Sequence, residues 1–423
     1  MQKVNLNPEK IRLLDYIESH HKHIFITGRA GTGKSTLLNH LKENSSKNLL
    51  VCAPTGIAAI NIGGQTIHSL FKFPLNFIET NHLKPDYKVL ALLKKIDMLI
   101  IDEISMVKAD LLDAVDYMLR SAHKTDLPFG GVQLVAFGDM YQLPPVISDE
   151  EIFLYTQHDY EGVYFFNAKV WQLAHLEIYE LQEIFRQKDD SFKDILNAIR
   201  VGRLTPEILK TLNTRCSKPA MGMITLATTN ATVASINEEK LNGLDDKEHT
   251  YMATISGDFD RNSYPTEEKL TLKVGAQIMM LKNDQDRRWV NGTIGRIFSL
   301  NKEDIKVFID GKTYTVKPES WNKINYVLNE KTGVVEEQVI ASFTQYPLRL
   351  AWAITIHKSQ GQTYEKIYLD LGRGAFAHGQ TYVALSRAVS LEGLFLARPI
   401  RTSDIILDPQ IVNFMRSAKI STL

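Results

Sequence analysis

The chain has 423 residues, of which 44% are hydrophobic and 23% are charged, and 49 basic side chains balance 49 acidic ones. This length suffices for two or three domains with buried cores, and the composition excludes an intrinsically disordered chain. The zero net charge excludes an overall basic field, so any site for a polyanion has to be local. Two cysteines make no disulfide or zinc framework, and no run of about eighteen apolar residues occurs, so we expect a cytoplasmic protein without a membrane partner.

The first predicted elements lead to a glycine-rich loop. Residues 8–19 have the apolar spacing of an amphipathic helix, with a proline suited to its first turn. Residues 23–27 form a short apolar strand and residues 34–42 a helix, and between them Gly28, Gly33, Lys34 and Ser35 fit the phosphate-binding loop pattern. Because strand, spacing and the Lys-Ser pair all occur together, we prefer this interpretation to the alternative, a glycine-rich loop that merely starts a helix.

A loop of this kind predicts a nucleoside triphosphate and Mg²⁺ as cofactors. Glycines allow a tight turn that aims backbone N–H groups at phosphate oxygens, next to the positive end of the helix. Lys34 is expected to hold the β- and γ-phosphates, and Ser35 to offer its hydroxyl to Mg²⁺. The nucleotide-binding residues predicted in the loop are Gly28, Ala30, Gly31, Thr32, Gly33, Lys34, Ser35 and Thr36.

The rest of the first half predicts a doubly wound parallel sheet. Buried strands are expected at residues 49–53, 95–101 and 131–137, with a helix at 110–121 and a small irregular insertion at 71–95. Asp102 and Glu103 follow one strand and Gln142 follows another, which places them at the edge of the sheet where α/β sites form. Asp102 is expected to bind Mg²⁺ with Ser35. Glu103 is expected to activate the attacking water, and Gln142 to sense the γ-phosphate.

The second half predicts another α/β core that is interrupted by β structure. Helices at residues 171–214 precede a strand at 223–227, and buried strands resume at 348–353, 366–369 and 394–397. Between them, short alternating strands and the hairpin signals Gly275, Asn291-Gly292, Gly295, Gly311 and Gly333 predict an inserted β-barrel. Arg186 and Arg387 are candidates for cations that reach the transferred phosphoryl group from across a cleft, although a single arginine is more often a surface charge.

The ordered set of motifs resembles that of superfamily-one helicases, within it the B-type branch, and most of all the petite-integration-frequency (PIF-one) helicases rather than RecD. The stretches that carry the resemblance are residues 28–36, 53–59, 66–69, 101–106, 137–143, 185–187, 354–363 and 382–387, with 274–280 and 291–295 in the predicted barrel. One departure concerns the glutamine that reads adenine in the family, since here Lys10 follows Glu9. Lysine has no acceptor and cannot make the paired amide contacts to adenine.

The resemblance implies two RecA-like cores that bind ATP between them. The first core is expected at residues 1–160, the second at 161–250 and 343–423, and an SH3-like β-barrel at 251–342. Gly361, Arg186 and Arg387 would complete the nucleotide site from the second core. Single-stranded DNA would lie across both cores, on Thr55, Thr66, His68, Thr355, His357, Lys358 and Ser359. Phe71 and Phe73 are candidates for base stacking or a duplex wedge, with ordinary packing as the equal alternative.

The function implied by the resemblance is that of a monomeric, ATP-dependent DNA helicase that translocates 5′ to 3′ on single-stranded DNA. Its expected partners are 5′-tailed duplexes and folded DNA such as G-quadruplexes. Three alternatives remain open: a helicase of the same superfamily for RNA or RNA–DNA hybrids, a nucleic-acid clamp that uses ATP as a switch, and a P-loop kinase or metabolic ATPase. The water-activating Glu103 argues against the clamp, which does not need it.

Overall fold

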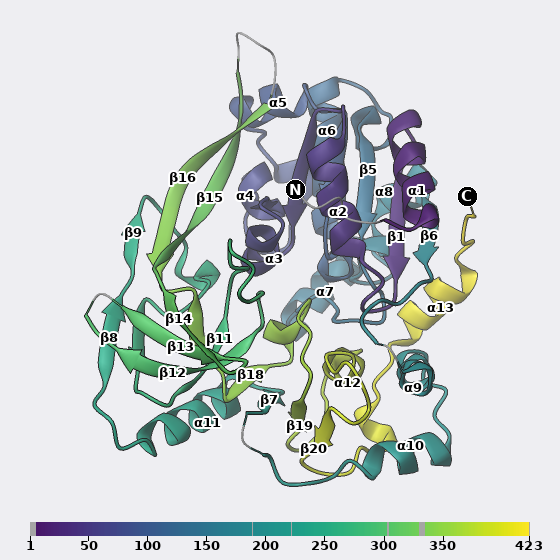
Figure 1. Ribbon diagram of the computed structural model, residues 1–423. Helices are drawn as coiled ribbons and strands as arrows, with labels where there is room; N and C mark the ends of the chain where they lie inside the picture. Colours follow the sequence, from purple (N-terminus) through teal and green to yellow (C-terminus); the bar gives the residue numbers. More distant parts are fainter. Residues whose placement is uncertain (1–5, 188, 221, 303, 330–334, 423) are drawn as a thin grey trace.

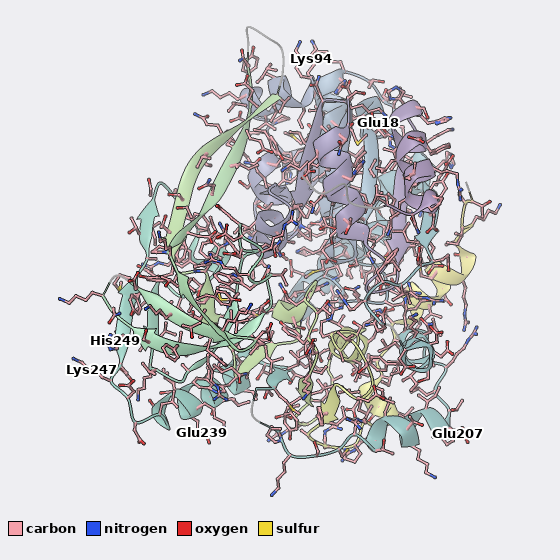
Figure 2. All side chains as sticks on the ribbon, in the orientation of Figure 1. Glu18, Lys94, Glu207, Glu239, Lys247 and His249 are labelled. Carbon is pink, nitrogen blue, oxygen red and sulfur yellow. The ribbon has the colours of Figure 1, made fainter. Side chains whose placement is uncertain are left out.

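The computed structural model describes residues 6–187, 189–220, 222–302, 304–329 and 335–422, so the hairpin glycine Gly333 lies outside the described residues. Two α/β cores lie against each other, and a β-rich insertion extends from the second core along the side of the first (Figure 1). Charged side chains such as Lys94, Glu207 and Lys247 point outward from the edges of the molecule (Figure 2). Among the described residues, no helix is both long and apolar enough to cross a membrane. The cytoplasmic location stays a prediction.

The first core is built on a six-stranded parallel sheet in the order β3-β2-β4-β5-β1-β6. Its strands are β1 (Ile24–Gly28), β2 (Leu49–Ala53), β3 (Gln65–Thr66), β4 (Met98–Ile101), β5 (Gln133–Phe137) and β6 (Glu177–Leu181). Every residue of β1, β4 and β5 is buried, because helices cover both faces of a parallel sheet. The carboxyl ends of these central strands therefore meet at one edge.

The helices of the first core form two apolar layers, one on each face of this sheet. Leu13, Ile17, Leu37 and Leu41 of α1 and α2 pack on one face, and α6 contributes most of its residues to the larger cluster on the other. The helices are α1 (Pro8–Ser19), α2 (Lys34–Asn44), α3 (Gly56–Asn61), α4 (Ile67–Phe71), α5 (Tyr87–Leu93), α6 (Ala109–His123), α7 (Asp149–Gln157) and α8 (Lys169–Ala174). Short 3-10 turns are η1 (Thr80–His82), η2 (Ile104–Met106), η3 (Pro128–Gly131) and η4 (Phe165–Asn167).

Strand β6 corrects the predicted end of the first core at residue 160. It pairs in parallel with β1, from Ile24 opposite Glu177 to Gly28 opposite Leu181, so the first core continues to at least Leu181. The prediction placed this segment among helices of the second half. Its sequence, Glu-Ile-Tyr-Glu-Leu, mixes charged and apolar residues, because an edge strand is only half covered. Which strand it pairs with is set by tertiary packing and not by its own sequence.

The second core has a four-stranded parallel sheet in the order β18-β7-β19-β20. Its strands are β7 (Ile224–Ala227), β18 (Ala353–Thr355), β19 (Ile367–Asp370) and β20 (Leu394–Leu396). Its helices are α9 (Asp190–Arg200), α10 (Pro206–Asn213), α11 (Asn230–Asn242), α12 (Gln380–Leu385) and α13 (Pro409–Ser417), with 3-10 turns η6 (His357–Ser359) and η7 (Thr402–Asp404). Helix α9 packs against α12, close to the first core.

The insertion contains three antiparallel sheets. The largest has the order β14-β13-β12-β11-β17, the second β15-β16-β9, and the smallest pairs β10 with β8. The strands are β8 (His249–Met252), β9 (Thr254–Ser256), β10 (Lys269–Leu272), β11 (Gln277–Met280), β12 (Ile294–Leu300), β13 (Ile305–Ile309), β14 (Lys312–Val316), β15 (Glu319–Leu328), β16 (Val335–Gln345) and β17 (Leu348–Leu350), with the 3-10 turn η5 (Arg261–Ser263). The strand predicted at 348–353 is thus split, because β17 pairs with β11 of the insertion and only β18 returns to the second core. The insertion therefore reaches Leu350 and not residue 342.

Strands β15 and β16 form a long hairpin that lies along the first core (Figure 1). The amide of Gln65 donates to the Ile324 carbonyl at 2.5 Å, and the Tyr326 hydroxyl contacts the backbone N and O of Val51, each at 3.4 Å. These contacts fix the insertion beside β3, which carries the predicted DNA-binding residue Thr66.

Candidate active site

The phosphate-binding loop lies between β1 and α2, as predicted. Gly31 and Gly33 have φ values of +84° and +82°, and a Cβ at Gly31 would lie 2.5 Å from the Cβ of Arg186. The Lys34 ammonium donates to the carbonyls of Gly28 at 2.7 Å and Arg29 at 3.1 Å, so it lies inside the loop. Burial lowers the pKa of Lys34. A glycine cradle with an enclosed lysine fits a nucleotide polyphosphate.

Asp102 and Glu103 lie directly after β4, at the same sheet edge as the loop. Burial raises the pKa of Asp102 to about 6, and burial together with the Asp102 charge raises that of Glu103 to about 7. Glu103 has φ 49° and ψ 44°, a left-handed conformation that is uncommon outside glycine and concentrates at functional sites. Within the described residues no group of three or more His, Cys, Asp or Glu could hold a metal. A single carboxylate with the exposed Ser35 suits Mg²⁺, which keeps several waters.

A buried polar network extends from these residues across the cleft, and three of its members were not predicted. Asp139 is fully buried and accepts from Arg200 at 3.1 Å and from the Gln142 amide at 3.2 Å. The Gln360 amide donates to Gln142 and to Glu103, each at 3.3 Å. Asp139 and Gln360 lie inside stretches that carried the family resemblance, so their positions in those motifs could have identified them as site residues. Arg200 had no such signal, because it follows from the packing of α9.

Arg186 and Arg387 both lie at this cleft, with their guanidinium groups bound to backbone carbonyls. Arg387 is 1% exposed and donates to the carbonyls of Ser359 and Gln362 at 3.3 Å. Arg186 donates to the carbonyls of Ser386 and Gly361 at 3.2 Å. Burial lowers the pKa of both, and together with the charge of Arg387 it lowers that of Arg186 to about 9. At the cleft, Arg387 is therefore a buried cation and Arg186 a half-buried one.

The second core also contacts the phosphate loop directly. The Tyr382 hydroxyl accepts from the Ala30 N–H at 3.1 Å and donates to Asp139 at 3.4 Å. Beside the loop, the Lys10 ammonium lies 4.1 Å from the centre of the Phe185 ring and close to Gly33. Burial lowers the pKa of Lys10. An exposed aromatic ring and a cation next to the phosphate loop are suited to a nucleotide base.

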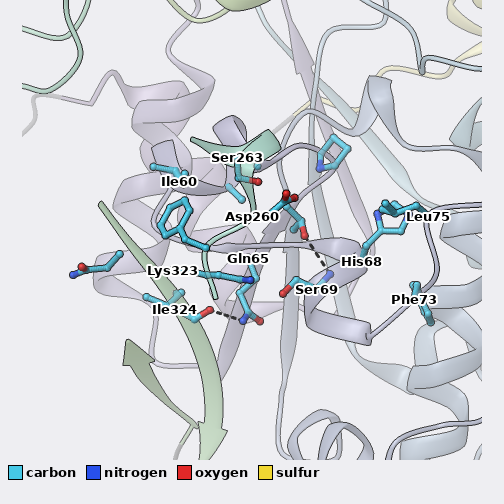
Figure 3. A pocket seen from close by; sticks show the side chains of 17 residues that line it. Ile60, Gln65, His68, Ser69, Phe73, Leu75, Asp260, Ser263, Lys323 and Ile324 are labelled. Carbon is cyan, nitrogen blue, oxygen red and sulfur yellow. Dashed lines mark hydrogen bonds between the residues drawn. The ribbon is translucent and has the colours of Figure 1, made fainter. Parts of the chain in front are cut away.

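The predicted DNA-binding residues of the first core lie where the insertion covers it. Thr55 and Thr66 cap the short helices α3 and α4 through their hydroxyl groups. Thr66 and His68 line a cavity of about 440 Å³, whose opposite wall is formed by insertion residues, among them Asp260, Ser263 and Lys323 (Figure 3). Thr55, Thr66 and His68 are all half-buried, so the insertion leaves their side chains partly accessible.

The predicted residues of the second core divide into two groups. Thr355 and Ser359 are buried, and their hydroxyl groups form hydrogen bonds within the turn. The Thr355 hydroxyl accepts from the Lys358 N–H at 3.2 Å, and the Ser359 hydroxyl donates to the Ile356 carbonyl at 2.7 Å. Lys358 is exposed and His357 half-buried. Thr355 and Ser359 therefore build the turn that presents Lys358.

Phe71 and Phe73 are buried in this structure, although Phe73 also lines the cavity beside Thr66 and His68. They are 2% and 7% exposed and stack on each other with ring centres 5.3 Å apart. Ordinary packing, the alternative to base stacking, therefore describes them here, because both rings belong to the core cluster of the first core.

The fold and the site together define a P-loop nucleoside triphosphatase with two α/β cores and its nucleotide site between them. Residues 5–210 match the family described as PIF1-like helicase, and residues 260–300 match the 2B domain of DNA helicase Pif1. The ATP-dependent DNA helicase Pif1 of Bdellovibrio bacteriovorus is 32% identical over 98% of this chain and 93% of its own length. The Xenopus laevis enzyme PIF1 is 35% identical over 97% of this chain, which spans 63% of that protein.

Solved structures agree with this assignment. The complex of Bacteroides sp Pif1 with ADP-AlF4 is 40% identical, covers 97% of this chain and 96% of its own, and superposes with a TM-score of 0.91. Bacteroides Pif1 bound to ssDNA has the same identity and coverage but a TM-score of 0.71. The chain belongs to the PIF1-like helicase family, with two RecA-like cores, and is an ATP-hydrolysing enzyme and DNA helicase. Its parts are arranged as in the ADP-AlF4 complex and equally as in unliganded Pif1 from Bacteroides sp, whose TM-score is 0.90.

Proposed function

We propose that this chain uses ATP hydrolysis to move 5′ to 3′ along single-stranded DNA and to separate the duplex ahead of it. One observation supports the coupling of ATP hydrolysis to movement, while the direction follows from the family resemblance: residues 355–362 form a single stretch of the second core that serves both predicted sites. Arg186 and Arg387 hold its carbonyls at the nucleotide cleft, while Lys358 of the same loop is exposed. A change at either site is therefore transmitted to the other through a few residues.

In the hydrolysis step, the residues of the first core bind and orient. Lys34 would leave its carbonyl partners to hold the β- and γ-phosphates, and Ser35 and Asp102 would hold Mg²⁺, whose role is to neutralise charge on the phosphates. Glu103 would accept a proton from the attacking water, which requires its carboxylate form. Arg186, Gly361 and Arg387 would close on the nucleotide from the second core, with Gln142 next to the γ-phosphate.

For the nucleic acid, Lys358 and His357 would contact phosphates from the second core, and Thr55, Thr66 and His68 from the first. Hydroxyl, imidazole and ammonium groups bind phosphates without reading sequence, as a translocating enzyme requires. The buried Thr355 and Ser359 would act by shaping the turn. Alternate opening and closing of the nucleotide cleft would then move the strand between the two sets.

The experiment measures ATP hydrolysis with and without single-stranded DNA, and the unwinding of duplexes that carry only a 5′ or only a 3′ tail. The proposal expects strong stimulation and opening of the 5′-tailed duplex alone. Stimulation without unwinding would favour the ATP-switched clamp, and no stimulation would favour a metabolic ATPase. RNA, RNA–DNA hybrid and G-quadruplex substrates in the same assay distinguish the remaining alternatives. Light scattering tests the proposed monomer.

A further inference from the structure

Gln360 links the general base to the DNA-facing turn. Its side-chain nitrogen carries two N–H groups, and both have acceptors 3.3 Å away: Glu103 Oε2 and Gln142 Oε1. Glu103 belongs to the first core, and Gln360 to the second. The contact therefore joins the water-activating carboxylate to the opposite side of the nucleotide cleft.

The backbone of Gln360 is continuous with the turn η6 that presents Lys358. Its N–H donates to the His357 carbonyl at 3.2 Å and so closes this turn. Gln360 and Lys358 also line one small cavity of about 60 Å³, opposite Ile57 and Asn61 of α3. The same side chain thus borders the space next to the predicted DNA contacts and touches the residue that would activate water.

We propose that Gln360 is a positioning residue that restrains the Glu103 carboxylate until single-stranded DNA occupies the turn His357–Ser359. In the arrangement without DNA, the amide binds one of the two carboxylate oxygens that would accept the proton of water. When a DNA phosphate binds at Lys358, the turn shifts and the amide leaves. At 3.3 Å the contact is near the limit of a hydrogen bond, so a movement of about 1 Å breaks it.

The backbone of Glu103 explains why a restraint at this point has an effect. Its left-handed conformation starts the 3-10 turn η2 directly after β4, and within the described residues its side chain accepts a hydrogen bond from Gln360 and from no group of the first core. The amide from the second core is thus the contact that sets the carboxylate direction. The inference rests on the proposed function, since it assigns to Gln360 the coupling of DNA binding to hydrolysis.

The test compares Gln360→Met with the unaltered protein, because methionine has a similar length and no N–H donor. We expect the DNA-free kcat for ATP hydrolysis to rise roughly tenfold, the effect of releasing one hydrogen bond to a charged group. The KM for ATP should change less than about twofold, since no nucleotide contact is removed, and the DNA-stimulated kcat should stay within about twofold. The stimulation by DNA therefore falls roughly tenfold. Thermal melting confirms that the variant is folded.

Gln157→Met is the matched control. Gln157 is exposed at the last residue of α7, outside both predicted sites, and receives the same substitution. This variant should keep the unaltered DNA-free rate. An unchanged or lowered DNA-free kcat in folded Gln360→Met protein would overturn the inference alone. Absence of DNA stimulation in the unaltered protein would instead overturn the proposed function, and with it the coupling.

Discussion

Arg200 is the side chain whose replacement is expected to destabilise the cleft most strongly. It is 5% exposed and donates to the fully buried Asp139 at 3.1 Å and to Glu180 at 3.3 Å. Burial alone would raise the pKa of Asp139, but the charges of Arg200 and Lys34 lower it below its usual value. Asp139 is therefore a buried carboxylate that depends on its cationic partners.

The magnitude follows from what Arg200→Met leaves behind. Methionine fills part of the volume of the stem, but the charge on Asp139 loses its closest partner, which costs about 3–5 kcal/mol for a buried pair. The contact with Glu180 adds less than about 1 kcal/mol, because that side chain is 21% exposed. At about 2–4 °C per kcal/mol for a domain of this size, the melting temperature should fall by roughly 6–20 °C.

The assay is thermal melting followed by circular dichroism, with Lys193→Met as the control on the same helix. Lys193 pairs with Asp190, whose side chain is 91% exposed, so this variant should melt within about 2 °C of the unaltered protein. The double variant Arg200→Met with Asp139→Asn removes both charges and should recover at least half of the loss. A melting temperature of Arg200→Met within about 2 °C of the unaltered protein would refute the reasoning.

Three further predictions concern the nucleotide site. Lys34→Ala should lower ATP hydrolysis by about 10²-fold or more and leave single-stranded DNA binding largely in place; unchanged hydrolysis would contradict the phosphate-loop assignment. The pKa of Glu103 is raised to about 7, and only its carboxylate form accepts a proton, so the DNA-free rate should fall as the pH is lowered through about 7. A kcat that stays constant between about pH 6 and pH 8 would argue against Glu103 as the general base. The Lys10 ammonium only donates hydrogen bonds, whereas guanine offers two acceptors and adenine one acceptor and one donor. Lys10→Gln should therefore raise the ratio of ATP affinity to GTP affinity by about tenfold, as measured by binding of fluorescent nucleotides. An equal ratio in the variant and the unaltered protein would mean that the nucleotide base does not bind beside Lys10.

The parts of the site that could be predicted are those set by local sequence. The strand, glycine loop and helix around Gly28–Ser35 are contiguous, and each follows from turn chemistry and apolar pattern. The acids after β4 were predicted because a buried strand followed by Asp102 and Glu103 is also contiguous. By contrast, Thr355 and Ser359 were predicted to bind DNA and are buried here, since the sequence does not show which hydroxyl groups a 3-10 turn uses internally.

The sequence by itself determined the phosphate loop, the acidic motif and the order of the buried strands, because these depend on residues close together along the chain. Only the tertiary structure decided the edge position of β6, the pairing of β17 with β11 of the insertion, and the contacts of Arg200 with Asp139 and of Gln360 with Glu103. These partners are 61 and 257 residues apart in the sequence. Their meeting depends on how the two cores and the insertion pack, and packing is set by the sum of many weak contacts that no local pattern records.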